Sequence, residues 1–139
     1  MSGALGYLLI RAEGRAYGLP LNSVRQVGDL GEVLSVPRAL PAIRGLTPFG
    51  GRLVPLVHLG ALLGERTPPA ERGRTIVVVA LAAEQRLVAF EVDDADEVVR
   101  EGALPVPDGE SLPWASGVAR RADALVPILD LALLEDRIA

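Results

Sequence analysis

Cysteine and lysine are absent from this chain of 139 residues, and histidine and tryptophan occur once each. Without cysteine there is no disulfide framework, no thiolate metal site and no cysteine nucleophile. All 14 basic residues are arginines against 18 acidic residues, so the formal net charge is −4. A chain with this charge lacks the basic surface that attracts nucleic acids and anionic membranes. We therefore expect neither as a partner.

Long uncharged apolar runs are missing as well. The longest, residues 53–64, contains a proline and a histidine and falls short of the roughly 18 residues that a membrane-spanning helix needs. Residues 1–10 have no basic stretch ahead of an apolar one, so they resemble neither a secretion signal nor an anchor. These features predict a cytoplasmic protein without direct membrane insertion.

What the chain does contain is typical of a packed domain. Half of its residues are hydrophobic and 23% are charged, a balance that excludes intrinsic disorder. A chain of this length buries roughly two thirds of its surface on folding, so it needs no metal to be stable. We predict one domain over residues 1–139 and no cofactor.

An internal repeat is the clearest pattern in the sequence. Residues 53–59, Leu-Val-Pro-Leu-Val-His-Leu, return as Leu-Val-Pro-Ile-Leu-Asp-Leu at 125–131, and Gly45 matches Gly117 at the same offset. Residues 65–74 lie between the copies and have the composition of a linker. We therefore expect subdomains at about residues 1–64 and 75–139, allowing for exchange of terminal segments between them.

Short apolar segments bounded by turn residues predict that strands dominate both halves. The first half should hold five strands, at residues 7–12, 16–21, 33–36, 43–47 and 53–57. The second half repeats the first hairpin, with strands at 75–82 and 87–92 around a turn at 84–85. This pattern predicts a mainly β fold of two small barrels packed side by side.

Two further features refine this prediction. Pro55 and Pro127 lack the N–H that a central strand uses, so their strands should be edges or bulged. Residues 59–63 and 131–138 have the pattern of short helices, the second capped by Asp130.

Several short motifs follow one another in a characteristic order along nearly the whole chain. They are Tyr17-Gly-Leu19, Val24 to Val27, Val36-Pro37 with Pro41, Ile43-Arg-Gly45-Leu46, Gly51 before Leu53-Val-Pro-Leu-Val57, Thr75 to Val79, Val92-Asp93 and Glu97-Val98. Their order and spacing resemble the bacterial chemotaxis coupling protein family, CheW. The resemblance implies two five-stranded SH3-like β-barrel subdomains with pseudo-twofold symmetry. It also implies a non-enzymatic adaptor that bridges a CheA-type histidine kinase to the cytoplasmic tip of methyl-accepting chemoreceptors.

The resemblance further implies two contact sites. The receptor-binding groove between the barrels would be formed by Val24, Gln26, Gly45, Ile76 and Val98. The kinase-contact loop would comprise Phe49, Gly50 and Arg52. If the groove is placed correctly, Gly45→Asp should weaken receptor binding and leave the fold intact. Alternatively, the apolar members of the groove only hold the barrels together.

The sequence departs from the family pattern at two positions. The turn usually reads Asn-Leu-Arg-Gly, and here it is Pro48-Phe49-Gly50-Gly51, so the arginine of the contact surface is missing. His58 replaces an aspartate near the strand end. These departures favour an alternative, a diverged relative that serves another chemosensory or motility output with a different partner. In either case we expect Phe49, rather than Arg52, to supply the replacement contact.

The remaining candidate sites have simpler explanations. His58 has no recognisable nucleophile beside it, so a histidine bonded to backbone at a strand end is favoured over catalysis. The acidic run 93–97 lacks the donor pattern of a calcium loop and predicts a solvated turn. A third alternative is a small-molecule or peptide-binding β-barrel, which a cavity lined by Asp93 and His58 would support.

Overall fold

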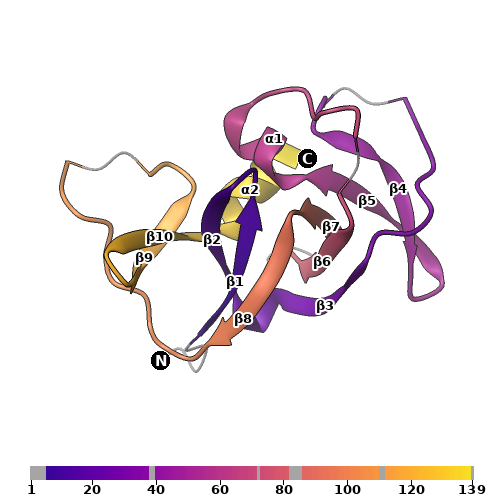
Figure 1. Ribbon diagram of the computed structural model, residues 1–139. Coiled ribbons are helices and arrows are strands. Elements are labelled where there is room, and N and C mark those ends of the chain that lie inside the picture. The colour runs from indigo at the N-terminus through magenta and orange to yellow at the C-terminus, as the bar shows by residue number, and fades with distance from the viewer. Residues whose placement is uncertain (1–5, 38–39, 72, 82–85, 110–111, 139) are drawn as a thin grey trace.

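The computed structural model describes residues 6–37, 40–71, 73–81, 86–109 and 112–138 (Figure 1). Strands account for most of the regular structure in these ranges, as predicted. The elements are β1 (Tyr7–Ala12), β2 (Arg15–Pro20), β3 (Val24–Asp29), β4 (Ile43–Phe49), β5 (Arg52–His58), α1 (Leu59–Gly64), β6 (Thr75–Ala80), β7 (Leu87–Val92), β8 (Asp94–Val99), β9 (Ala115–Arg121), β10 (Ala124–Leu129) and α2 (Leu131–Ile138), with a short 3₁₀ helix at Leu21–Ser23.

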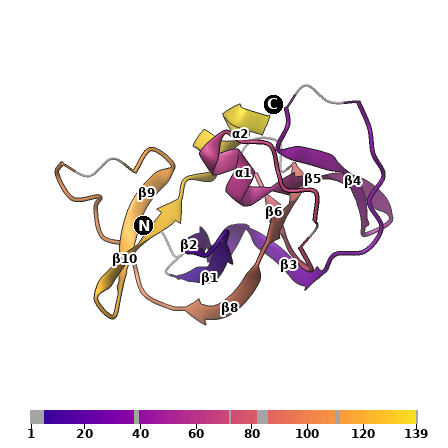
Figure 2. The ribbon, with the colours of Figure 1, turned by 45° about the horizontal axis from the view of Figure 1, so that its top comes forward.

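The strands form two five-stranded sheets, which confirms the predicted fold class. The first sheet has the order β8-β1-β2-β10-β9 and the second has the order β3-β6-β7-β5-β4. Among the described residues, strand pairing leaves both sheets open, so hydrogen bonds close neither of them into a complete barrel. In both ribbon views α1 and α2 lie side by side on one side of the molecule, whereas β3 and β8 lie on the other (Figures 1 and 2).

Each sheet takes strands from both halves of the repeat. The hairpin β1–β2 joins β8, β9 and β10 from the second half, and the hairpin β6–β7 joins β3, β4 and β5 from the first. Parallel pairing of β10 with β2, and of β5 with β7, makes this exchange. The sheets therefore do not follow the division at residues 65–74: each half contributes its leading hairpin to the other sheet.

Three apolar clusters hold the fold together. The largest lies between the sheets and includes Ile10, Phe90 and Leu129, all fully buried. A second cluster forms around Tyr7 in the first sheet and a third around Leu56 in the second. Both faces of the inner strands are thus covered, which explains why β6 reads as an unbroken apolar run instead of an alternating one.

Two predicted elements are wrong. Residues 33–36 do not form a strand, since Leu34 makes an isolated bridge with Leu46, and the fifth strand of that group is β3 instead. The acidic run is not a turn, because Asp94 to Val99 form the edge strand β8. Exposed acidic side chains are compatible with an edge strand, where they discourage pairing with another chain. The predicted turn at 84–85 lies outside the described residues.

Both repeat prolines sit in inner strands, and the pairing register shifts close to each of them, so the bulged alternative of the prediction applies and the edge alternative does not. Pro55 lies in β5, between β7 and β4, and Pro127 lies in β10, between β2 and β9. Each proline comes one residue before parallel pairing begins, at Leu56 in β5 and at Ile128 in β10. The strands tolerate proline because its missing N–H faces the side where the sheet is still open.

Residues 65–74 are tied to the second sheet by a buried ion pair. The Arg44 guanidinium pairs with the Glu91 carboxylate, and their side chains are 9% and 2% exposed. Arg44 also donates to the carbonyl oxygens of Pro69 (2.8 Å) and Glu71 (2.9 Å), and Glu91 accepts from the Gly73 N–H (2.5 Å). Despite its linker composition, this segment is a strap fixed to the domain.

Candidate functional site

The tip of the β4–β5 hairpin is a two-residue turn that favours glycine. Phe49 pairs with Arg52 across it, and Gly50 and Gly51 have φ of +59° and +80°. Positive φ at both central residues is the signature of a type I′ hairpin turn, where glycine is favoured. A Cβ added at Gly50 meets no atom within 4 Å. A side chain at this position would therefore project into solvent.

Phe49 has a structural role at the base of this turn. It is half-buried and packs against the third cluster, which includes Val54 and Ile76. Phe49 therefore contributes to the packing of the fold, and its role as a contact anchor stays a prediction. The exposed residues of the hairpin include Arg52 and the neighbouring Leu53, which is 49% exposed.

Three of the five predicted groove residues lie on neighbouring strand edges. Val24 and Gln26 belong to β3, the edge of the second sheet, and Val98 is 47% exposed on β8, the edge of the first. The strand β8 contacts β6, which is the partner of β3. Val27, at 45% exposure on β3, adds an apolar residue that was not among the predicted groove residues.

The other two predicted groove residues are buried: Ile76 lies beside this surface and pairs with Gly28 of β3, whereas Gly45 lies on the far side of the second sheet. Ile76 is buried in the third cluster, and Gly45 is buried on β4, the opposite edge of the second sheet from β3. A Cβ built on Gly45 would stand 2.2 Å from the Leu34 carbonyl oxygen, far inside contact distance. Gly45→Asp would therefore disturb the fold, contrary to expectation.

The close approach of a loop carbonyl to a strand glycine occurs in both halves of the repeat. Leu34 bridges Leu46 beside Gly45, and Leu104 bridges Val118 beside Gly117. A Cβ on Gly117 would lie 2.7 Å from the Leu104 carbonyl oxygen. The matched glycines are thus explained by the close passage of a preceding loop.

His58 caps a helix. Its Nδ1 accepts a hydrogen bond from the Ala61 N–H at 3.0 Å, at the start of α1. Its repeat counterpart Asp130 accepts from the Ala132 N–H, also at 3.0 Å, at the start of α2. The sequence-based preference for a backbone-bonded histidine over a catalytic one agrees with this contact. The side chain is only 8% exposed, and burial lowers the pKa of His58 below its ordinary value of 6.5.

The capping role predicts a pH-dependent stability. Between pH 6.5 and the lower folded-state pKa of His58, the unfolded chain binds more protons than the folded one, so the free energy of unfolding falls as the pH is lowered. His58→Asn keeps a capping oxygen but cannot be protonated. We expect the variant to lose less stability than the wild type between pH 7 and pH 5, measured by urea denaturation. Equal losses in the two proteins would contradict this assignment.

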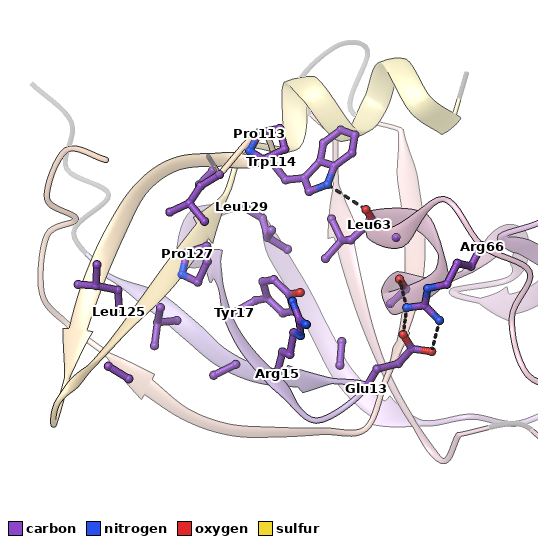
Figure 3. Close-up of a pocket in the computed structure, with 18 residues that line it drawn as sticks. Glu13, Arg15, Tyr17, Leu63, Arg66, Pro113, Trp114, Leu125, Pro127 and Leu129 are labelled. Atoms are coloured by element: carbon purple, nitrogen blue, oxygen red, sulfur yellow. Dashed lines mark hydrogen bonds and ion pairs between the residues drawn. The ribbon is translucent and has the colours of Figure 1, made fainter. Parts of the chain in front are cut away.

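A groove of about 780 Å³ opens where the hairpin β1–β2, α1 and β10 meet (Figure 3). It is lined by Tyr17, Trp114, Leu125 and Pro127 among others, with the Glu13–Arg66 ion pair at one end. Neither Asp93 nor His58 lines it, so it is not the cavity expected for the alternative of a small-molecule barrel. The part of the chain that the structure describes contains no cluster of potential metal ligands, and none of its helices is long and apolar enough to cross a membrane.

Comparison with known proteins shows which family has this architecture. The family model for the CheW-like domain matches residues 6–138. Among solved structures, the scaffolding protein TtCheW from Thermoanaerobacter tengcongensis superposes with a TM-score of 0.79 at 19% identity, covering 94% of this chain and 92% of that one. At this identity the likeness shows a shared fold. A search of curated proteins gave no significant match. Because the family model covers nearly the whole chain, the protein belongs to the family of CheW-like domains.

Proposed function

We propose that this protein is a non-enzymatic adaptor of a cytoplasmic chemosensory complex, coupling chemoreceptors to a CheA-type histidine kinase. The observation that carries the proposal is the family match over residues 6–138. The structural neighbour TtCheW is itself a scaffolding protein, in agreement with the proposal. The polar groups that sequence analysis considered for chemistry have structural roles, because His58 caps a helix and the acidic run lies in an edge strand.

In this proposal the receptor contact involves the edges of β3 and β8. Val27 and Val98 expose apolar side chains there, flanked by the polar Gln26 and Glu97. Apolar anchors with polar residues around them are characteristic of protein interfaces. A helical receptor tip could lay an apolar stripe against such a surface.

Reconstitution tests the coupling directly. A chemoreceptor cytoplasmic fragment and a CheA-type kinase are mixed with the protein, and kinase autophosphorylation from ATP is followed. We expect the protein to bind both partners and to change the kinase rate only when the receptor fragment is present. Val98→Glu should lower receptor affinity by about tenfold or more. The matched control is Leu133→Glu on α2, which is 41% exposed and lies outside both proposed contacts; it should bind normally. Equal affinity for the two variants would argue against the β3–β8 surface.

The kinase contact is proposed at the β4–β5 hairpin, with Phe49 fixing the tip and Arg52 and Leu53 facing the partner. The missing arginine at Gly50 favours a second candidate function, a diverged relative with another partner. Gly50→Arg distinguishes the two, because position 50 is open to solvent and the variant restores the arginine that the family carries in this turn. We expect the variant to bind the kinase more tightly and with a steeper salt dependence, measured by titration calorimetry at two ionic strengths. An unchanged affinity and salt response would favour the diverged relative.

A further inference from the structure

The first sheet is split between β2 and β10. These strands share only the parallel bridge between Gly18 and Ile128. In the second sheet the equivalent strands β5 and β7 also begin to pair only at the matching residues, Leu56 and Ala89, and continue for three residues. From Arg15 to Tyr17, and from Ala124 to Pro127, the two strands of the first sheet have no pairing with each other, and these residues line the groove.

The hairpin registers show which backbone groups face this split. Arg15 pairs with Ala12 across a two-residue turn, so the N–H and C=O groups of these two residues bind each other. The N–H and C=O groups of the next residue, Ala16, therefore point away from β1. Ala124 pairs with Arg121 in the same way, so the N–H and C=O of Leu125 point away from β9. The pairing of the described strands leaves these four groups of Ala16 and Leu125 without a partner.

The side chains around the split are apolar with one free cation. Tyr17, Leu125 and Pro127 line the groove, and the Leu125 side chain is 47% exposed. The Arg15 side chain lies beside Tyr17 (Figure 3) and makes no ion pair within the described part of the chain. The other arginine of the groove, Arg66, is already paired with Glu13.

We propose that this groove binds an extended segment of a partner protein, which adds as a strand between β2 and β10. Exposed strand edges supply main-chain hydrogen bonds to such a segment, and alternate pockets select its side chains. The partner segment should carry apolar residues at alternate positions and an aspartate or glutamate opposite Arg15. The site shares no residue with the proposed receptor and kinase contacts, so the inference does not depend on the coupling function.

The test uses a phage-displayed library of linear ten-residue peptides, selected on the intact protein. Enriched peptides should show apolar alternation with an acidic residue. Leu125→Pro removes the N–H that faces the groove without touching the ladder to β9, just as Pro127 already does. We expect this variant to bind the selected peptides about tenfold more weakly, while Leu125→Ala, which keeps the N–H, loses less. Arg15→Gln should weaken acidic peptides about two- to fivefold, and the exposed Arg74→Gln should not.

Amide hydrogen exchange identifies the binding mode. Strand addition should protect at least one of the Ala16 and Leu125 amides when peptide is bound. The proposal is overturned if the selection yields no peptide sensitive to Leu125→Pro. It is also overturned if bound peptides protect neither amide, since binding would then be through side chains alone. Thermal unfolding of each variant, compared with the wild type, checks that a lost interaction is not a lost fold.

Discussion

Gly45→Ala is expected to destabilise the protein by about 3 kcal/mol or more, although it adds a single methyl group. The added carbon would stand 2.2 Å from the Leu34 carbonyl oxygen and 3.3 Å from the Ser35 Cα. The nearest neighbours are backbone atoms, so no side chain can rotate away to make room. The preceding loop would have to move and break the Leu34–Leu46 bridge.

Two other glycines provide controls for this measurement. Gly117→Ala brings its carbon to 2.7 Å from the Leu104 carbonyl oxygen and should cost less than Gly45→Ala. Gly50→Ala meets no neighbour and should cost only the roughly 1–2 kcal/mol of a residue at positive φ. Chemical denaturation gives all three values. If Gly45→Ala proves no worse than Gly50→Ala, the close approach is not what requires glycine.

The second large effect is expected at the buried ion pair. Glu91→Gln leaves the Arg44 guanidinium buried without a counter-charge and should cost about 3–5 kcal/mol. The double variant Arg44→Met/Glu91→Leu removes both charges and should cost less than the sum of the single changes. The exposed pair of Arg121 with Glu97, at 36% and 54% side-chain exposure, is the control. Its loss should cost about 0–1 kcal/mol.

The strap offers a second readout of the same pair. Arg44 and Glu91 make the hydrogen bonds that hold Pro69, Glu71 and Gly73. We therefore expect trypsin to cleave Glu91→Gln within residues 65–74 faster than the wild type. If the stability costs of the two single variants add up to that of the double variant, the two charges are not coupled. If trypsin cleaves Glu91→Gln no faster than the wild type, the pair does not fix the strap.

Local pattern predicted most individual elements of this fold. The strands β1 and β7 begin and end at the predicted residues, and α2 follows the cap at Asp130 as expected. These elements are set by near-neighbour effects: turn residues, apolar runs and a capping side chain. The strands β3 and β8 were missed because their exposed polar residues resemble loops, and they become strands only by pairing with β6 and β1.

For the candidate sites, the sequence predicted which residues matter but not which atoms they contact in the folded protein. It identified the repeat, and with it the matched glycines, the helix cap at Asp130 and a backbone-bonded histidine at position 58. Only the tertiary structure showed that Gly45 lies against a backbone carbonyl and that Phe49 packs into the core.

The sequence by itself thus determined the fold class, the duplication and the family resemblance, because strand periodicity and motif order are properties of the chain. The exchange of hairpins between the halves, the strap held by a buried ion pair and the split between β2 and β10 were decided by the tertiary structure. These features depend on which strands pair across long separations, and the partners are chosen by the burial of three apolar clusters that no local segment encodes.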